Sequence, residues 1–243
     1  MRLDVTFSPG EIVPAELAGR TAVIIDVLRA STSIVEALAA GAKAIYPVPS
    51  VEEALRLAHS LGRQSVLLAG ERRRLPIEGF DLGNSPAEFS GERVAGKTLI
   101  MSTTNGTVVF GQAAAAERVL VAALGNLSAV VDELLRTEAE PVLLCSGRER
   151  QFALEDAICA GMLAGRLRAA GAGPWEMNDA ALAAIALAER FGSPEDLFPI
   201  TEAGRAIADV GLGDDLSFCA QLDRHQVVPI FQDRHITAAP ATL

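Results

Sequence analysis

The stretch TAVIIDVLRASTS, Thr21–Ser33, has the pattern of a buried strand that ends in a polar loop and continues as a helix. Four apolar residues, 22–25, run directly into the carboxylate of Asp26, and a base and three hydroxyl residues follow. An α/β protein commonly presents a site in this way, because the loop after a strand meets the N-terminus of the next helix. This segment therefore predicts an α/β fold and a site beside Asp26.

Asp26 has a simpler explanation as the N-cap of that helix, since Asp is preferred there. Leu28 and Ala30 are already good helix formers, however, so the cap is expected at Ser31 or Ser33 instead. We therefore interpret Asp26 as a functional carboxylate.

A similar unit follows at an offset of 77 residues, 147 minus 70. The segments GERRRLPIE, 70–78, and GRERQFALE, 147–155, both match G-x-x-R-x-(Leu/Phe)-x-(Ile/Leu)-Glu. Strand and helix patterns alternate through both units, 20–90 and 96–171, which predicts a largely parallel or mixed sheet with helices on both faces. Chance similarity between Ala- and Leu-rich segments is the alternative. We expect one α/β domain, 1–243, with a C-terminal extension at 172–243.

The expected elements follow from hydrophobic periodicity. Strands are predicted at 42–48, 65–70, 117–123, 141–147 and 227–231, and helices at 51–61, 127–136, 178–190 and 201–210.

Four polar loops are expected beyond the carboxyl ends of the strands, at 26–33, 70–85, 102–107 and 146–156. In such sheets the ligand lies there, because helix N-termini supply free N–H groups and the positive end of a dipole. The four loops therefore predict one binding site for an anion. Arg29, near the first helix start, could bind phosphate bidentately.

The last two loops each have two explanations. The loop STTNGT, 102–107, carries hydroxyls, an amide and a Gly that permits close backbone approach, which suits an anion cradle as well as an ordinary turn. Glu155 and Asp156 begin a predicted helix, where the dipole favours acids in any case. Arg148 and Arg150 in the same loop indicate a second role, in which bases bind an anionic substrate and acids bind a metal.

The turn DLGNSP, 81–86, is expected to be structural, with Asn84 or Ser85 capping a helix that starts at Pro86.

Two known nucleophile loops of phosphatases do not fit this sequence. The spacing from Cys145 to Arg148 is too short for a tyrosine phosphatase, and position 28 lacks the second Asp of the haloalkanoate-dehalogenase type.

Composition limits the partners. The net charge of −10 and the pI near 4.8 argue against nucleic acid. No apolar run approaches the roughly 18 residues that cross a bilayer, so no membrane partner and a cytoplasmic location are expected. The three cysteines are widely spaced and suit reduced thiols, which leaves carboxylates to hold any metal and favours Mg²⁺. Half of the chain is apolar, which is compatible with a homo-oligomer.

Four motifs in this order resemble the 2-phosphosulfolactate phosphatase family of coenzyme M biosynthesis. They are IIDVLRASTSIVEALAAGA (24–42), LLAGERRRLPIEGFDLGNSP (67–86), GKTLIMSTTNGT (96–107) and SGRERQFALEDAICAG (146–161), and the similarity returns at 215–229. The resemblance implies a Mg²⁺-dependent phosphatase that hydrolyses the phosphate ester of a small sulfonated, carboxylated acid. It also implies a three-layer α/β/α fold with an internal duplication.

The resemblance turns the polar loops into a site with expected roles. Asp26, Glu155 and Asp156 are the expected Mg²⁺ ligands. The expected catalytic residues are Asp26, Arg29, Glu71 and Arg148, and the expected substrate-binding residues are Ser31, Thr32, Arg72, Thr103, Thr104, Asn105, Gly106 and Arg150. Either Asp26 or Glu71 could take a proton from an attacking water, and an aspartyl-phosphate on Asp26 is the alternative to direct attack.

Two other functions are open. A phosphosugar or phosphoacid isomerase would bind the same anion without releasing phosphate. A phosphoacid-binding or regulatory module would keep the pocket without chemistry. In a family member from an organism that lacks the pathway, the substrate could be another phosphorylated hydroxy acid.

Overall fold

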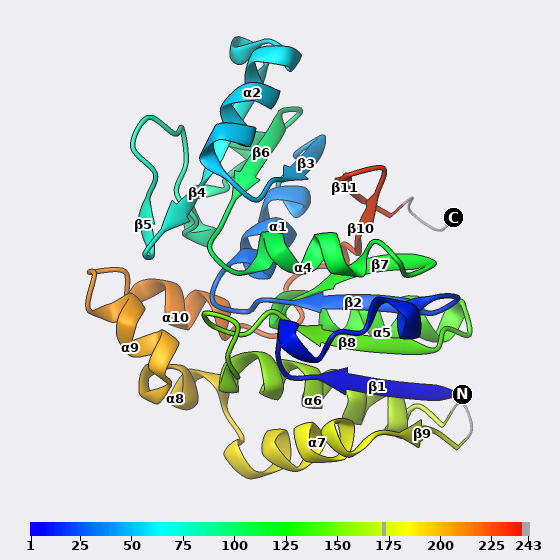
Figure 1. Ribbon diagram of the computed structural model, residues 1–243. Helices are drawn as coiled ribbons and strands as arrows, with labels where there is room; N and C mark the ends of the chain where they lie inside the picture. The colour runs from blue at the N-terminus through cyan, green and yellow to red at the C-terminus, as the bar shows by residue number, and fades with distance from the viewer. Residues whose placement is uncertain (172–173, 240–243) are drawn as a thin grey trace.

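A computed structural model describes residues 1–171 and 174–239. The strands of these residues form one sheet in the order β5-β4-β6-β3-β11-β10-β7-β2-β8-β1-β9 (Figure 1). Their bounds are β1 Arg2–Thr6, β2 Thr21–Ile25, β3 Ala44–Pro47, β4 Val66–Arg72, β5 Leu75–Pro76, β6 Thr98–Ser102, β7 Arg118–Ala122, β8 Pro141–Cys145, β9 Glu176–Met177, β10 Pro229–Gln232 and β11 His235–Ala238.

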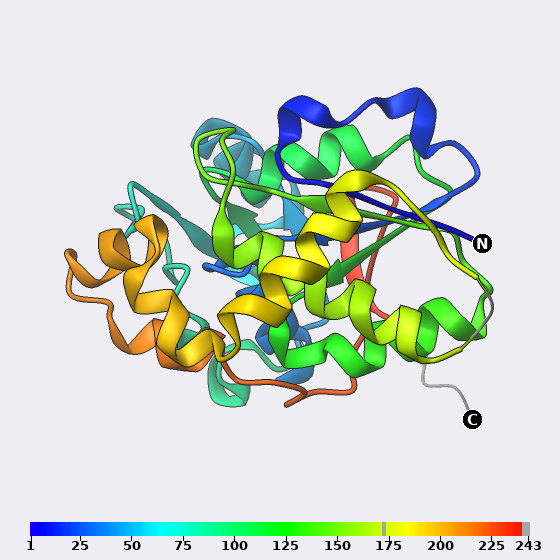
Figure 2. The ribbon, with the colours of Figure 1, turned by 90° about the horizontal axis from the view of Figure 1, so that it is seen from below.

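Helices cover both faces of this sheet, as Figures 1 and 2 show from two directions. Their bounds are α1 Ala30–Ala39, α2 Val51–Leu61, α3 Gly91–Val94, α4 Gly106–Ala113, α5 Leu127–Arg136, α6 Leu154–Ala169, α7 Asp179–Phe191, α8 Pro194–Leu197, α9 Glu202–Ala208 and α10 Asp214–Cys219. None of the helices in residues 1–171 and 174–239 combines the length and apolar character that crossing a membrane would need.

Strand β2 lies deep in the core. All five of its residues are buried, and it pairs in parallel with β7 on one side and β8 on the other. Its side chains alternate between two apolar clusters, because successive residues of a strand face opposite sides of the sheet. Ala22 and Ile24 pack with residues of α1 and α4, whereas Val23 and Ile25 pack with residues of α5 and α6.

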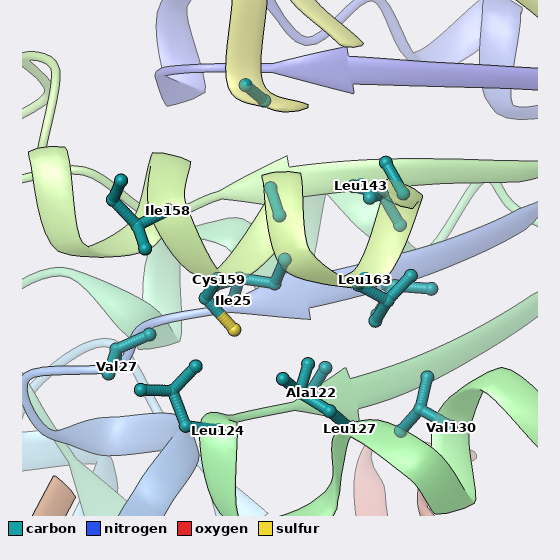
Figure 3. Packing of buried hydrophobic residues seen from close by; sticks show 14 of the residues in the cluster. Ile25, Val27, Ala122, Leu124, Leu127, Val130, Leu143, Ile158, Cys159 and Leu163 are labelled. Atoms are coloured by element: carbon teal, nitrogen blue, oxygen red, sulfur yellow. The ribbon is translucent and has the colours of Figure 1, made fainter. Parts of the chain in front are cut away.

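The second cluster forms the larger part of the core. Figure 3 shows Ile25 and Leu143 of the sheet in this cluster with Cys159 and Leu163 of α6. Each of these four side chains is fully buried. Because β2 is fixed from both faces and both edges, the loop that begins at Asp26 starts from a rigid element.

The two sequence units exchange their first strands. Strand β6 of the second unit lies between β3 and β4 of the first, and β2 of the first lies between β7 and β8 of the second. The hairpin β10–β11 joins the two parallel groups through antiparallel pairing with β7 and β3. Neither unit has its central strand without the other, which argues that they fold together. A common origin by duplication stays a prediction.

The α/β class, the helices on both faces and the largely parallel, mixed sheet are confirmed. The predicted helices 51–61 and 127–136 are α2 and α5 with the same bounds, and the last predicted strand is β10, Pro229–Gln232. The expected cap at Ser31 or Ser33 is wrong, because α1 begins at Ala30 and both serines lie inside it. The amide of Ala30 donates instead to Asp26 Oδ1 (3.3 Å).

Candidate active site

A cavity of about 230 Å³ lies where four loops meet. These are the loops that follow β2, β4, β6 and β8, as the sequence predicts, and α9 supplies a further wall through Ala203 and Ile207. Figure 1 shows α8, α9 and α10 beyond the end of the sheet at which β2 finishes. Ten of the predicted site residues line the cavity: Asp26, Arg29, Glu71, Arg72, Thr103, Thr104, Asn105, Arg148, Glu155 and Asp156.

Four of these ten residues are buried acids. Asp26, Glu71, Glu155 and Asp156 are each less than a tenth exposed. The pKa of the Asp26 carboxyl is raised to about 7, chiefly by burial. The charges of Glu71 and Glu155 act in the same direction, whereas the Ala30 amide and Arg29 lower the pKa. Burial also raises the pKa of Asp156, with the charges of Asp26 and Glu155 acting in the same direction. The cavity thus concentrates negative charge that a cation would stabilise.

Two of the acids brace the loops against each other. Asp156 accepts hydrogen bonds from the Val27 amide (2.9 Å) and the Gly147 amide (3.0 Å), so it ties the first loop to the fourth. Glu71 accepts from the amides of Thr104 (2.7 Å) and Arg74 (2.7 Å), so it ties the second loop to the third.

The other two acids are less engaged. Asp26 accepts the 3.3 Å contact from the Ala30 amide through one oxygen, and the neighbouring Ser31 Oγ accepts from the Asp26 amide instead. Glu155 lies in the electric field of Arg148, which lowers its pKa against the dominant raising effect of burial. Asp26 and Glu155 therefore have the oxygens most available to a ligand.

The donor set is one of hard oxygens, which suits Mg²⁺. No three His, Cys, Asp or Glu side chains are grouped as ligands of one metal ion in the part of the chain that the structure describes. Mg²⁺ usually takes only one or two protein carboxylates and completes its shell with water and substrate phosphate. The acids of the cavity fit that mode of binding, whereas Asp26, Glu155 and Asp156 are not assembled as a ready three-ligand cage.

Five arginines line the cavity, and three of them, Arg29, Arg72 and Arg148, are each held differently. Arg29 is 3% exposed and donates to Asp215 Oδ2 (2.7 Å) and to the Arg74 carbonyl (2.7 Å). Arg72 donates to Ser102 Oγ (2.8 Å). Arg148 is partly exposed and forms an ion pair with Glu202 at the start of α9. Positive charge thus reaches the cavity from the first, second and fourth loops.

The structure places three predicted substrate-binding residues, Ser31, Thr32 and Arg150, outside the cavity lining. Ser31 and Thr32 are buried beneath the first loop, where Thr32 Oγ1 donates to the Val27 carbonyl (2.8 Å). Gly106 is the first residue of α4, and its position relative to the cavity is not among the described features. Arg150 is at an exposed turn with a positive φ of 66°. Ser31 and Thr32 support the loop that carries Asp26, so their contribution to the site is indirect.

The paired glycines of the repeated motif have a physical explanation. Gly70 has a φ of 151°, and a Cβ there would lie 2.1 Å from the Ser102 carbonyl oxygen. Gly147 has a φ of 62°, and its Cβ would lie 2.2 Å from the Gln151 carbonyl oxygen. Both positions need Gly on two counts, conformation and space. The motif therefore marks a close approach of the backbone within β4, at Gly70, and another in the loop after β8, at Gly147.

Several residues of the site have no counterpart among the predicted ones. Asn84, expected to be structural, lines the cavity, and its buried Oδ1 has no hydrogen-bond partner among the described residues. Ala203 and Ile207 come from the extension, as does Asp215, which anchors Arg29. The similarity at 215–229 pointed to this region but to no residue in it. Ser85 precedes a 3-10 turn that begins at Pro86, so the predicted helix start is confirmed for a shorter element.

Arg148→Ala is expected to lower kcat/KM for an anionic phosphate ester by about tenfold or more, on the order of 1.4 kcal/mol. The reason is that this guanidinium lines the cavity beside Glu155 and its only ion-pair partners among the described residues, Glu149 and Glu202, are well exposed. Arg150→Ala is the matched control, because Arg150 lies two positions away and outside the cavity lining. Steady-state kinetics of both variants test this. Equal losses in the two variants would remove Arg148 from the site.

Comparison with known proteins gives one consistent family. A family model described as 2-phosphosulpholactate phosphatase matches residues 6–234. A protein of Symbiobacterium thermophilum is 43% identical over 227 residues, which cover 93% of this chain and 97% of the relative. One of Carboxydothermus hydrogenoformans is 40% identical, covering 94% and 92%, and one of Clostridium beijerinckii is 33% identical, covering 98% and 99%. All three are named probable 2-phosphosulfolactate phosphatase.

Proposed function

Because this chain belongs to the 2-phosphosulfolactate phosphatase family, we propose that it is a Mg²⁺-dependent phosphoric monoester hydrolase that converts 2-phosphosulfolactate to sulfolactate and phosphate. The observation that carries the proposal is the cavity in which four buried carboxylates lie beside five arginines. An anion binder that performed no chemistry would have no use for the acids, whereas a metal-assisted phosphatase needs both kinds of group.

The substrate has three anionic groups, and the cavity supplies cationic groups on different walls. Arg29 is buried next to Asp26, where charge changes during reaction would be felt most strongly. Three further arginines line the cavity and are more exposed than Arg29. They are Arg73 and Arg74, at the turn between β4 and β5, and Arg148. We assign Arg29 to the phosphoryl group and the other arginines to the sulfonate and carboxylate.

Mg²⁺, bound through Asp26 and Glu155 with Asp156 beside them, would polarise the phosphoryl group and orient a water. The chain's own groups then manage charge and protons. Glu71 is held by two backbone amides and keeps a second lone pair on each oxygen, so it accepts the proton of the attacking water. As the water oxygen bonds to phosphorus, the ester P–O bond breaks and Arg29 offsets the charge that develops. The proton that Glu71 took from the water then passes to the leaving oxygen, which gives the alcohol and restores the Glu71 carboxylate.

The proposed setting is the cytoplasm and the biosynthesis of coenzyme M. The three cysteines are all free and buried, which fits a reducing compartment. Association into a homo-oligomer stays a prediction.

Release of inorganic phosphate from 2-phosphosulfolactate and a panel of other phosphorylated hydroxy acids, with Mg²⁺ and with EDTA, tests the function. We expect release that requires the metal and favours 2-phosphosulfolactate. Metal-dependent release that favours another compound would keep the chemistry and reassign the substrate. Binding of phosphate with no release from any compound would indicate a binding module, and conversion of a phosphate ester without release would indicate an isomerase.

A further inference from the structure

The extension beyond the two repeated units reaches into the site through one buried carboxylate. Asp215 in α10 is 4% exposed, although the residue before it, Asp214, begins the helix and is exposed. Its Oδ2 accepts a hydrogen bond from Arg29 Nη1 at 2.7 Å, across 186 positions of sequence. The side chains of this ion pair are 2% and 6% exposed.

The second oxygen of Asp215 is also occupied. Ser85 Oγ, from the second loop of the site, donates to Oδ1 at 2.5 Å. Asp215 therefore connects α10 to two loops at once and uses both oxygens of its carboxylate in doing so.

Arg29 is fixed at two of its nitrogens. Nη1 donates to Asp215, and Nη2 donates to the Arg74 carbonyl at 2.7 Å. Because a guanidinium is planar, two anchored nitrogens determine the orientation of the whole group. The group still lines the cavity, and its charge lowers the pKa of Asp26, which is raised chiefly by burial.

A buried ion pair of this kind is a poor source of stability, because the cost of removing both charges from water offsets their attraction. Its benefit is geometric. A phosphoryl group is recognised by two parallel N–H groups of an arginine, and that recognition loses affinity when the guanidinium is free to rotate.

We propose that Asp215 is a positioning residue that, with Ser85, holds Arg29 in the orientation that binds the phosphoryl group of the substrate. The expected effect on kcat/KM rests on the proposed function. The expected effect on binding of inorganic phosphate requires only that the site binds an anion. Asp215 touches no substrate and acts through Arg29.

A double-mutant cycle tests this coupling. Binding of inorganic phosphate in the presence of Mg²⁺ is measured by calorimetry for the wild type, Asp215→Asn, Arg29→Ala and the double variant. We expect Asp215→Asn to weaken binding about tenfold and Arg29→Ala about a hundredfold, with no further loss in the double variant. The same pattern is expected in kcat/KM, and Asp215→Glu should recover part of the loss.

Asp4→Asn is the matched control. Asp4 forms another buried ion pair, with Arg20 Nη1 at 2.5 Å, and it lies outside the cavity lining. Asp4→Asn should lower the free energy of unfolding, as Asp215→Asn does, but leave phosphate binding unchanged. If Asp215→Asn does not fold, Ser85→Ala removes the other anchor of the carboxylate and should weaken binding about threefold in the wild type and not at all in Arg29→Ala.

Additive losses in the cycle would overturn the proposal, since Asp215 would then act independently of Arg29. Absence of phosphate binding to the wild type would overturn it as well. A wild type that binds phosphate but hydrolyses no ester would refute only the proposed function, because the binding cycle would still report on Asp215.

Discussion

Asp26→Asn is expected to lower the rate of phosphate release by about a thousandfold while the protein stays folded. Asn keeps the shape of Asp but carries no negative charge, so the substitution removes the carboxylate that we propose as a Mg²⁺ ligand. The residue follows a strand that is buried on both faces and both edges, which holds the substituted side chain in place. Phosphate release at saturating Mg²⁺ measures the effect.

The same substitution should stabilise the metal-free protein near neutral pH. Burial raises the folded-state pKa of Asp26 to about 7, from 3.8 for the unperturbed group. Between these values the folded chain binds more protons than the unfolded chain, so stability falls as pH rises from about 4 to about 7. Asn does not take up this proton, so the free energy of unfolding of Asp26→Asn should depend less on pH between about 4 and about 7. Denaturant unfolding in EDTA across this pH range measures it.

Asp132→Asn is the control, because Asp132 is exposed on α5 and carries the same change of charge away from the cavity. It should leave both turnover and the pH dependence of stability near wild type. Full activity of Asp26→Asn would remove Asp26 from the mechanism. Lost activity with an unchanged pH dependence would mean that the carboxyl is not desolvated in the folded protein.

The convergence of four loops was predictable from sequence because it depends on local patterns. An apolar run of strand length, a polar loop and an Ala-rich helix fix where each strand ends, and parallel strands with crossover helices bring such ends together. The order of strands was not predictable. Exchange of β2 and β6 between the units, and insertion of β10–β11 in the middle of the sheet, depend on pairing between distant segments.

Within the loops, the sequence predicted which residue types the site contains, but it did not predict which of those side chains line the cavity. Arg148 lines the cavity and Arg150 does not, although both belong to one short segment. The segment turns so tightly that Arg148 and Gln151 exchange backbone hydrogen bonds and Glu149 and Arg150 take positive φ values. No periodicity applies to such a turn, so alternation could not tell the two arginines apart.

The residues from the extension were missed for another reason. Asp215 becomes part of the site only because α10 docks beside Ser85 and Arg29. Asp214 and Asp215 are adjacent acids in the first turn of a helix, where the dipole favours acids anyway, so the sequence gave no sign that one of them is buried. Asn84 was missed for a similar reason. The neighbouring turn and cap residues predict a structural role for it, and they carry no information about the cavity that it lines.

Gly70→Ala is expected to damage both stability and activity. The φ of 151° at Gly70 belongs to a region that is almost exclusive to Gly, and a Cβ there would lie 2.1 Å from the backbone oxygen of Ser102. Strain and the forced movement of β4 away from β6 together should lower the free energy of unfolding by about 3 kcal/mol or more. Chemical denaturation and steady-state kinetics measure the two effects.

The loss of activity follows from what β4 carries past Gly70. Glu71 bonds to the Thr104 amide and Arg72 to Ser102 Oγ, so a shift between the strands separates the second loop of the site from the third. We expect a loss of about a hundredfold in kcat/KM, since small displacements of positioned groups are costly. Inorganic phosphate should also bind more weakly.

Gly96→Ala separates conformational strain from collision. Gly96 also has a positive φ, 70°, but a Cβ there would meet nothing within 4 Å. It should cost only about 1 kcal/mol of stability and leave activity unchanged. Similar effects of the two substitutions would show that strain alone accounts for Gly70. Normal stability and activity of Gly70→Ala would show that the backbone of β6 leaves room for a Cβ at position 70, contrary to the 2.1 Å separation from the Ser102 oxygen.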